Sequence, residues 1–202
     1  MSKLVSSILN STMPTSIVKI EVTNSEVKEM SVNVWFSGCK LACQGCHNMG
    51  LKDRKQGLTL GEAARQIYDR INDLKIKWVV FTGGNPPDSP DALAYLLYFC
   101  KELGSNTLVY TGYTLNEFKN KTKVHHMQFY FENCDLIKTG AYKLDMLSDK
   151  YYFASVNQEV YYLTHCDFTC VYKWDPINGK SVVPTSLASD GTTIPEELYF
   201  FK

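Results

Sequence analysis

Hydrophobic and polar positions along this chain switch between two periods, which predicts strands alternating with helices. Apolar residues recur at helical spacing over 59–74 and again over 89–104. Short apolar runs rich in β-branched and aromatic residues lie before and after these helices and predict strands. The predicted strands cover residues 17–22, 31–36, 77–81, 107–110, 134–138 and 160–163. Strand, loop, helix and strand in this order indicate parallel βα units, so we expect an α/β fold.

The length limits what these units can build. A chain of 202 residues suits one domain but is too short for eight complete βα units. We therefore expect an incomplete, barrel-like curved sheet, mostly parallel, with flanking helices. In a single domain covering 1–202, the core spans about 17–164, and 165–202 form a C-terminal extension. Strand-like segments at 168–173 and 180–183 within this extension predict a β-hairpin.

Local capping signals indicate where three helices begin. Thr59 with Glu62, and Thr114 with Glu117, have the Thr-x-x-Glu spacing of a capping box. Ser89 is followed by proline, a residue favoured in the first helical position, so we expect Ser89 to cap the helix that starts there.

Composition and charge exclude some classes of function. Lys plus Arg equals Asp plus Glu at 21 each, so the net charge of zero gives no general attraction to nucleic acid or an anionic membrane. We find no run of 18 apolar residues and no signal-peptide core, which predicts a cytoplasmic protein with no membrane partner. Seven cysteines in a reducing compartment suggest a metal or catalysis before a disulfide framework.

Three of these cysteines gather in one loop, predicted directly after the second strand. Cys39, Cys43 and Cys46 lie within eight residues with C-x3-C-x2-C spacing. Cysteine thiolates hold iron–sulfur clusters, usually four to a cluster. Three ligands would leave one iron open to a small molecule. A zinc site formed by the same cysteines and His47 is the alternative, but Cys46 and His47 are adjacent and rarely could both reach one tetrahedral ion.

Two further features support a site at the carboxyl edge of the sheet. Gly83 and Gly84 follow the strand 77–81 and allow a ligand to approach the backbone closely. Because parallel strands end at a common edge, we expect these glycines beside the cysteine loop.

The motifs resemble those of a known family. The C-x3-C-x2-C loop is similar to that of the radical S-adenosylmethionine superfamily, and Gly83-Gly84-Asn85-Pro86 resembles its Gly-Gly-Glu-Pro motif. The segments 43–48, 110–114, 135–140 and 155–158 are similar to the anaerobic ribonucleoside-triphosphate reductase activating proteins, over about residues 17–163.

The resemblance implies an enzyme with a [4Fe–4S] cluster and S-adenosyl-L-methionine as cofactors. Cleavage of the latter would give a 5′-deoxyadenosyl radical, which removes a hydrogen atom from a glycine of a large anaerobic ribonucleotide reductase subunit. Reduced flavodoxin or a similar donor would supply the electron. By the same resemblance, the metal ligands and catalytic residues are Cys39, Cys43 and Cys46. The cofactor contacts are Gly45, Cys46, His47, Gly83, Gly84 and Asn85.

Some points of the sequence depart from this family or allow other functions. Asn85 replaces the usual acidic residue, so it would bring no charge to the cofactor's ammonium. The alternatives are another small radical enzyme, such as a deazapurine-forming synthase, and a non-catalytic zinc-binding interaction module.

The remaining cysteines and histidines have simpler interpretations. Cys100 and Cys134 are predicted in the core, and Cys166 and Cys170 as free thiols. The histidine pair at 125–126 is predicted at the surface.

Overall fold

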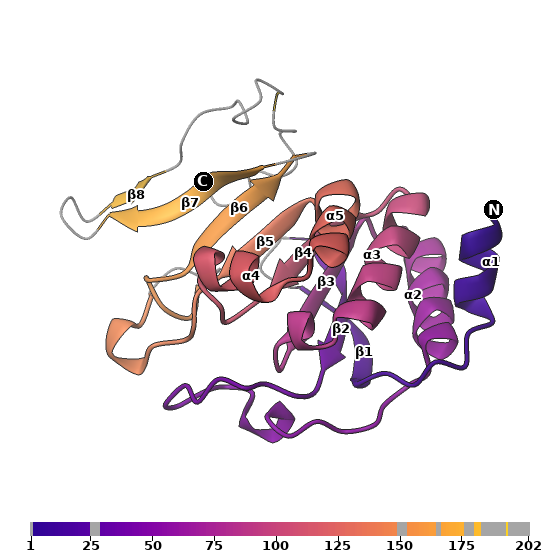
Figure 1. Cartoon of the computed structure of the whole chain (residues 1–202), viewed down its shortest axis with the longest axis horizontal. Helices are drawn as coiled ribbons and strands as arrows, with labels where there is room; N and C mark the ends of the chain where they lie inside the picture. The colour runs from indigo at the N-terminus through magenta and orange to yellow at the C-terminus, as the bar shows by residue number, and fades with distance from the viewer. Residues whose placement is uncertain are drawn as a thin grey trace.

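The structure is a computed structural model with one sheet and five α-helices over the part of the chain that it describes (Figure 1). It describes residues 2–24, 29–148, 153–164, 167–175, 180–182 and 193, of which 173–175 and 180–182 are described by their backbone alone. The strands are β1 (Ile17–Asn24), β2 (Met30–Phe36), β3 (Trp78–Gly83), β4 (Asn106–Tyr110), β5 (Leu136–Thr139), β6 (Glu159–Leu163), β7 (Phe168–Asp175) and β8 (Lys180–Val182). The α-helices are α1 (Lys3–Leu9), α2 (Leu60–Leu74), α3 (Pro90–Glu102), α4 (Leu115–Lys121) and α5 (Val124–Asn133). Three short 3₁₀ helices are η1 (Met49–Leu51), η2 (Pro86–Asp88) and η3 (Leu144–Met146).

The sheet order follows the chain, from β1 at one edge to β8 at the other. Strands β2, β3, β4 and β5 pair in parallel, whereas β1 pairs antiparallel with β2. Beyond β5 the pairing is antiparallel through β6, β7 and β8. The α/β class is therefore confirmed. The sheet is open, because β1 and β8 lie at its opposite ends.

The parallel strands bring their following loops to one edge of the sheet. Backbone hydrogen bonds tie these loops to the ends of neighbouring strands: the N–H of Gly84 donates to Phe36 O of β2 at 2.8 Å, and that of Thr111 donates to Lys138 O of β5 at 2.8 Å. The predicted meeting of the cysteine loop and the glycine pair at this edge is confirmed.

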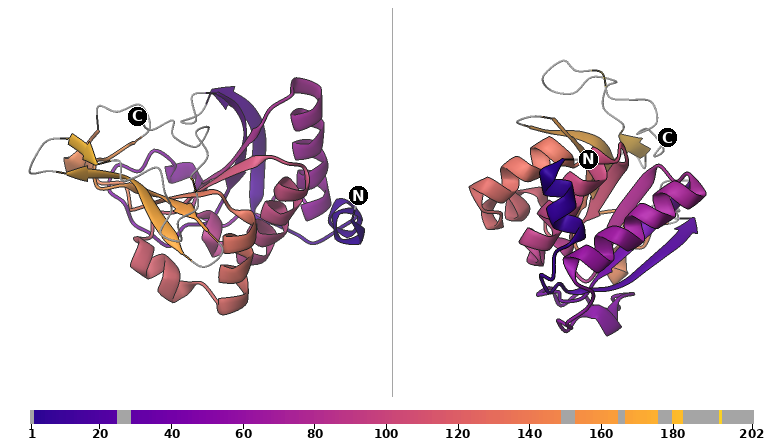
Figure 2. Two further views of the ribbon diagram at one scale, coloured as in Figure 1. Left: turned by 90° about the horizontal axis from the view of Figure 1, so that it is seen from above. Right: turned by 90° about the vertical axis from the view of Figure 1, so that its right-hand side faces the viewer.

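The two faces of the sheet carry different apolar clusters. Strand β3 is buried along its whole length, with Val79 and Phe81 packed in the cluster beneath the helices. Trp78 and Val80 point to the other face and pack with residues of β4 to β7. Helix α2 packs on β1 and β2, and α3 packs on β4 (Figure 2). Within the described residues, the helices therefore cover one face of the sheet and leave its other face free of helices.

The capping predictions are mostly confirmed. Both Thr-x-x-Glu pairs form complete capping boxes, at the starts of α2 and α4. Pro90 opens α3 as expected. Ser89, however, makes no side-chain cap for α3, because its hydroxyl pairs with the buried hydroxyl of Ser16 at 2.6 Å.

The prediction of a surface location for the histidine pair is wrong for His126. This side chain is 5% exposed, and its Nε2 lies 2.8 Å from Asp91 Oδ1. Helices α1 and α5 were not among the predicted elements. In the described part of the chain, no helix has the length and apolar character needed to cross a membrane.

The C-terminal hairpin is confirmed by the antiparallel pairing of β7 with β8. Cys170 lies on β7 and is not in a disulfide, as predicted, whereas Cys166 lies outside the described residues. Cys100 and Cys134 are buried free thiols, as predicted.

Candidate functional site

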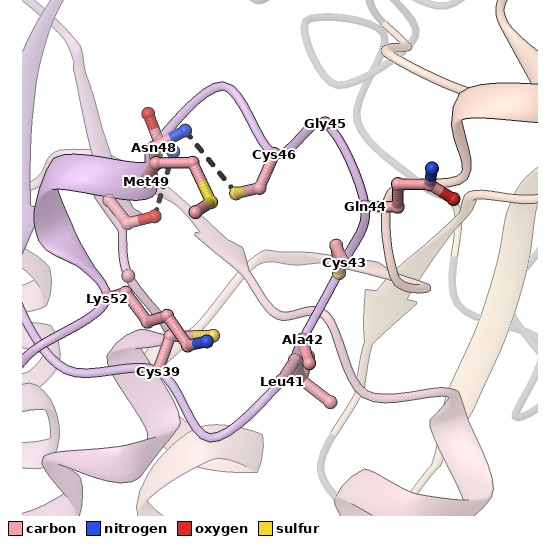
Figure 3. Close-up of a pocket in the computed structure, with 12 residues that line it drawn as sticks. Cys39, Leu41, Ala42, Cys43, Gln44, Gly45, Cys46, Asn48, Met49 and Lys52 are labelled. Atoms are coloured by element: carbon pink, nitrogen blue, oxygen red, sulfur yellow. Dashed lines mark hydrogen bonds between the residues drawn. The ribbon is translucent and has the colours of Figure 1, made fainter.

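Three free, half-buried cysteines line a single cavity at the carboxyl edge of the sheet. Cys39, Cys43 and Cys46 lie on one loop after β2, and that loop curls around a cavity of about 210 Å³. The sulfur atoms of Cys39 and Cys46 are turned toward the space that the loop encloses (Figure 3). The remaining lining residues are Leu41, Ala42, Gln44, Gly45, Asn48, Met49, Lys52, Gly83 and Gly84.

The shape of this loop is fixed by backbone pairing between its two ends. The N–H of Gly38 donates to Leu51 O at 2.8 Å, and the N–H of Cys39 donates to Lys52 O at 2.9 Å. Gly38 has a φ of +93°, a conformation that favours glycine. The pairing explains why Met49 and Lys52 line the cavity, although no spacing in the sequence predicts this.

Gly83 and Gly84 form one side of the cavity and pack closely against the backbone of the residues around the start of the cysteine loop. A Cβ atom on Gly84 would lie 2.5 Å from Gly38 O, and one on Gly83 would lie 2.4 Å from Phe36 O. Gly83 also has a φ of +105°. A side chain on Gly84 would therefore push the cysteine loop away, and one on Gly83 would push away the end of β2.

Asn48 joins the loop to the same glycine pair. Its Nδ2 donates to Gly83 O at 2.8 Å, and its backbone N–H donates to Cys46 Sγ at 3.4 Å. An N–H group directed at a sulfur stabilises negative charge there, one of the effects that tune thiolate-held clusters. Asn48 was not among the cofactor contacts predicted from the sequence.

The predicted contacts Gly45 and His47 differ in position. Gly45 lines the cysteine cavity with a φ of +69°, close to Leu144. His47 is exposed, and its ring packs edge-on against Tyr142 with centroids 4.8 Å apart. His47 lines a larger adjoining cavity of about 630 Å³, which Cys46 and Asn48 also reach.

Asn85 is set apart from Gly83 and Gly84. Its side chain is 1% exposed and does not line the cysteine cavity. Its Oδ1 accepts hydrogen bonds from Thr111 Oγ1 at 2.9 Å and from the Gly112 N–H at 3.1 Å. The geometry supports a brace between loops, and contact of Asn85 with the cofactor stays a prediction.

The electrostatics around Cys39 favour its neutral form in the metal-free protein. Burial raises the pKa of the Cys39 thiol, and the nearby Asp88, Cys43 and Cys46 raise it further. A hydrogen bond from the Leu41 N–H lowers this pKa.

Asp88 also pairs with a tyrosine: the Tyr113 hydroxyl donates a hydrogen bond to Asp88 Oδ1 at 2.8 Å. Burial, followed by this carboxylate, raises the pKa of Tyr113.

The cysteine set fits a cubane cluster. In the described residues, no three Cys, His, Asp or Glu side chains meet closely enough for a single metal ion. A cubane takes each thiolate on a different iron, so the three sulfur atoms need not meet at one point. Three thiols around one cavity, with an N–H directed at Cys46 Sγ, match the donor set of such a cluster.

Comparisons with known proteins agree with this geometry. Residues 28–161 match the family described as "4Fe-4S single cluster domain". The chain is 32% identical over 160 residues to the anaerobic ribonucleoside-triphosphate reductase-activating protein of Pasteurella multocida, covering 75% of this chain and 94% of that protein. It is 31% identical over 78 residues to a Methanocaldococcus jannaschii protein named for glycyl-radical enzyme activation, covering 38% of this chain and 31% of that protein.

The family match over residues 28–161 includes the loop and the strands that form the cavity, and the match to the Pasteurella multocida protein covers three quarters of the chain. They also identify the cofactors of the family as a [4Fe–4S] cluster and S-adenosylmethionine. The chain belongs to the 4Fe-4S single cluster domain family and, within it, to the radical S-adenosylmethionine activating proteins.

Proposed function

We propose that this chain activates an anaerobic ribonucleotide reductase by generating a glycyl radical on its large subunit. The observation that carries the proposal is the single cavity lined by Cys39, Cys43 and Cys46 and closed by Gly83 and Gly84. The similarity to the reductase-activating protein of Pasteurella multocida, which spans 94% of that protein, supports the choice of partner.

The three cysteines would hold the cluster as thiolates. Since burial favours the neutral thiol of Cys39, cluster binding would release a proton from that residue. When bound, the cluster would supply the electron for cleaving S-adenosylmethionine to the 5′-deoxyadenosyl radical, the species that would remove a hydrogen atom from the partner's glycine. The electron would come from reduced flavodoxin or a similar donor.

The backbone around the cavity would orient the cofactor. The Gly83 carbonyl already accepts a hydrogen bond from Asn48, and a carbonyl oxygen has a second lone pair for an ammonium group. Gly45 and Gly84 line the same cavity, where the absence of side chains lets a ligand reach the backbone. His47 would contact the cofactor from the adjoining cavity.

The adjoining cavity would admit the partner's glycine. It lies over the face of the sheet that the helices leave free and is lined from several strands by Asn33, Trp35, Thr82, Tyr110 and Lys138. It meets the cysteine cavity at Cys46 and Asn48. A peptide loop entering there would bring its glycine near the cofactor, as a reaction by direct hydrogen transfer requires.

The test is radical transfer to the reductase of the same organism. The protein is reconstituted with iron and sulfide without oxygen, reduced, and mixed with S-adenosylmethionine and the reductase. A glycyl-radical doublet in the spin-resonance spectrum, absent when the reductase glycine is replaced by alanine, is the expected result. Production of 5′-deoxyadenosine with no radical on the reductase would favour another small radical enzyme instead. A colourless protein that keeps zinc would contradict the proposal as a whole.

A further inference from the structure

A lysine lines the cavity formed by the three cysteines. Among the described residues that line this cavity, Lys52 is the one basic side chain, and no Asp or Glu lines it. In Figure 3 its ammonium group lies on the same side of the cavity as the Cys39 sulfur. Lysine side chains are positively charged at neutral pH. Lys52 therefore brings a positive charge to the edge of the cavity proposed for the cluster, whereas Asp88 is the charged side chain that acts on the Cys39 thiol itself.

The backbone holds Lys52 at this position. Its carbonyl oxygen accepts the Cys39 N–H at 2.9 Å, and its own N–H donates to Met49 O at 3.2 Å. The residue is thus paired with the first cysteine of the loop, and replacing its side chain leaves these backbone bonds intact. The side chain is exposed, and none of the ion pairs found among the described residues includes it.

A cation at this place acts on the redox chemistry of a cluster. Taking up one electron makes the cluster and its thiolates more negative by one charge. A nearby cation stabilises this reduced state more than the oxidised state, since the Coulomb energy grows with the charge. Net charge and solvent exposure are among the factors that set the reduction potential of iron–sulfur clusters.

We propose that Lys52 raises the reduction potential of the cluster and so makes the cluster easier to reduce by a one-electron donor. The inference rests on the proposed function, because it takes Cys39, Cys43 and Cys46 as the ligands. It assigns Lys52 an electrostatic role that does not need S-adenosylmethionine to be present.

The test is an anaerobic redox titration of the reconstituted protein, without S-adenosylmethionine, followed by the loss of visible absorbance. In Lys52→Met, the ratio of reduced to oxidised cluster at a fixed potential should fall by about threefold to tenfold, where tenfold corresponds to 59 mV for a one-electron couple. Lys52→Arg keeps the charge and should stay close to wild type. The difference should shrink at high salt, because the side chain is exposed.

Lys40→Met is the matched control. Lys40 is also exposed and follows Cys39 directly in the chain, but it does not line the cavity. Its replacement removes the same unit charge and should change the ratio clearly less than Lys52→Met. Equal changes in the two variants would overturn the proposal, because the effect would then come from net charge alone.

The outcomes separate this inference from the proposed function. A wild-type protein that assembles no cluster contradicts the proposed function. A loaded wild type with the same potential as loaded Lys52→Met contradicts only the role of Lys52. A change that appears only with S-adenosylmethionine present also overturns it, since Lys52 would then act on the cofactor. Should Lys52→Met hold less iron than wild type, Lys52→Gln is titrated and judged by the same criterion.

Discussion

The side-chain oxygen of Asn85 accepts a hydrogen bond from Thr111 Oγ1 at 2.9 Å. This bond joins the loop after β3 to the loop after β4. The backbone N–H of Asn85 donates at the same time to Gly38 O at 2.9 Å, at the start of the cysteine loop. One buried residue therefore ties together three loops at the edge of the sheet where the cavity lies.

Replacement of Asn85 by alanine should destabilise the metal-free protein. The Thr111 hydroxyl and the Gly112 N–H would lose their shared acceptor, and each buried polar group left unpaired costs about 1–3 kcal/mol. Urea unfolding measures the loss. A double-mutant cycle with Thr111→Val should give a coupling energy of about 0.5–3 kcal/mol. Strictly additive effects of the two substitutions would show that the bond contributes nothing.

Gly84→Ala should disturb the cavity from its glycine side. The new Cβ would lie 2.5 Å from Gly38 O and 3.0 Å from Leu51 O, so the cysteine loop must move. We expect a loss of about 1–3 kcal/mol in stability and less iron bound per chain after reconstitution. Gly50→Ala is the matched control on the same loop, because a Cβ there meets nothing within 4 Å. A Gly84→Ala protein with wild-type iron content and stability would contradict this packing argument.

Each of the substitutions Cys39→Ser, Cys43→Ser and Cys46→Ser should remove a cluster ligand. The bound iron should fall by roughly tenfold or more after desalting, because even the loss of a residue that only contacts a metal ligand lowers metal affinity by about tenfold or more. Iron analysis and the visible spectrum measure it. Cys170→Ser provides the control, because Cys170 is a half-buried cysteine on β7 that does not line the cavity. If one of the three variants keeps the full cluster, its cysteine is not a ligand.

Glu62 should make folding stability depend on acid pH. Its carboxylate accepts bonds from Thr59 N at 2.7 Å and from Thr59 Oγ1 at 2.9 Å, and these bonds lower the pKa of Glu62 below its ordinary value of 4.5. A lowered pKa in the folded state means that the stabilisation is fully present above pH 4.5 and is lost as the pH falls through the folded-state value.

Glu62→Gln keeps the capping-box shape but does not titrate. As the pH is lowered from about 6 to about 3, the unfolding temperature of this variant should therefore fall less steeply than that of wild type. Glu117→Gln tests the second capping box in the same way, because bonds from Thr114 lower the pKa of Glu117 as well. Parallel curves for wild type and both variants would mean that neither box carries the acid dependence.

The sequence by itself determined the features that depend on residues close together in the chain. The capping boxes, the order of strands and helices, and the spacing of Cys39, Cys43 and Cys46 are all local. Helix starts follow from bonds within one turn, and strand and helix periods follow from which side of each element is buried. For this reason, the α/β class and the position of the cysteine loop could be predicted.

Only the tertiary structure decided the features that need contacts between distant residues. Ser89 was expected to cap α3, but its hydroxyl meets Ser16, 73 positions away in the chain. His126 is buried against Asp91 of another helix, and Lys52 reaches the cavity through backbone pairing with Cys39. These partners are brought together by the sheet and by burial, and no local period or spacing encodes them.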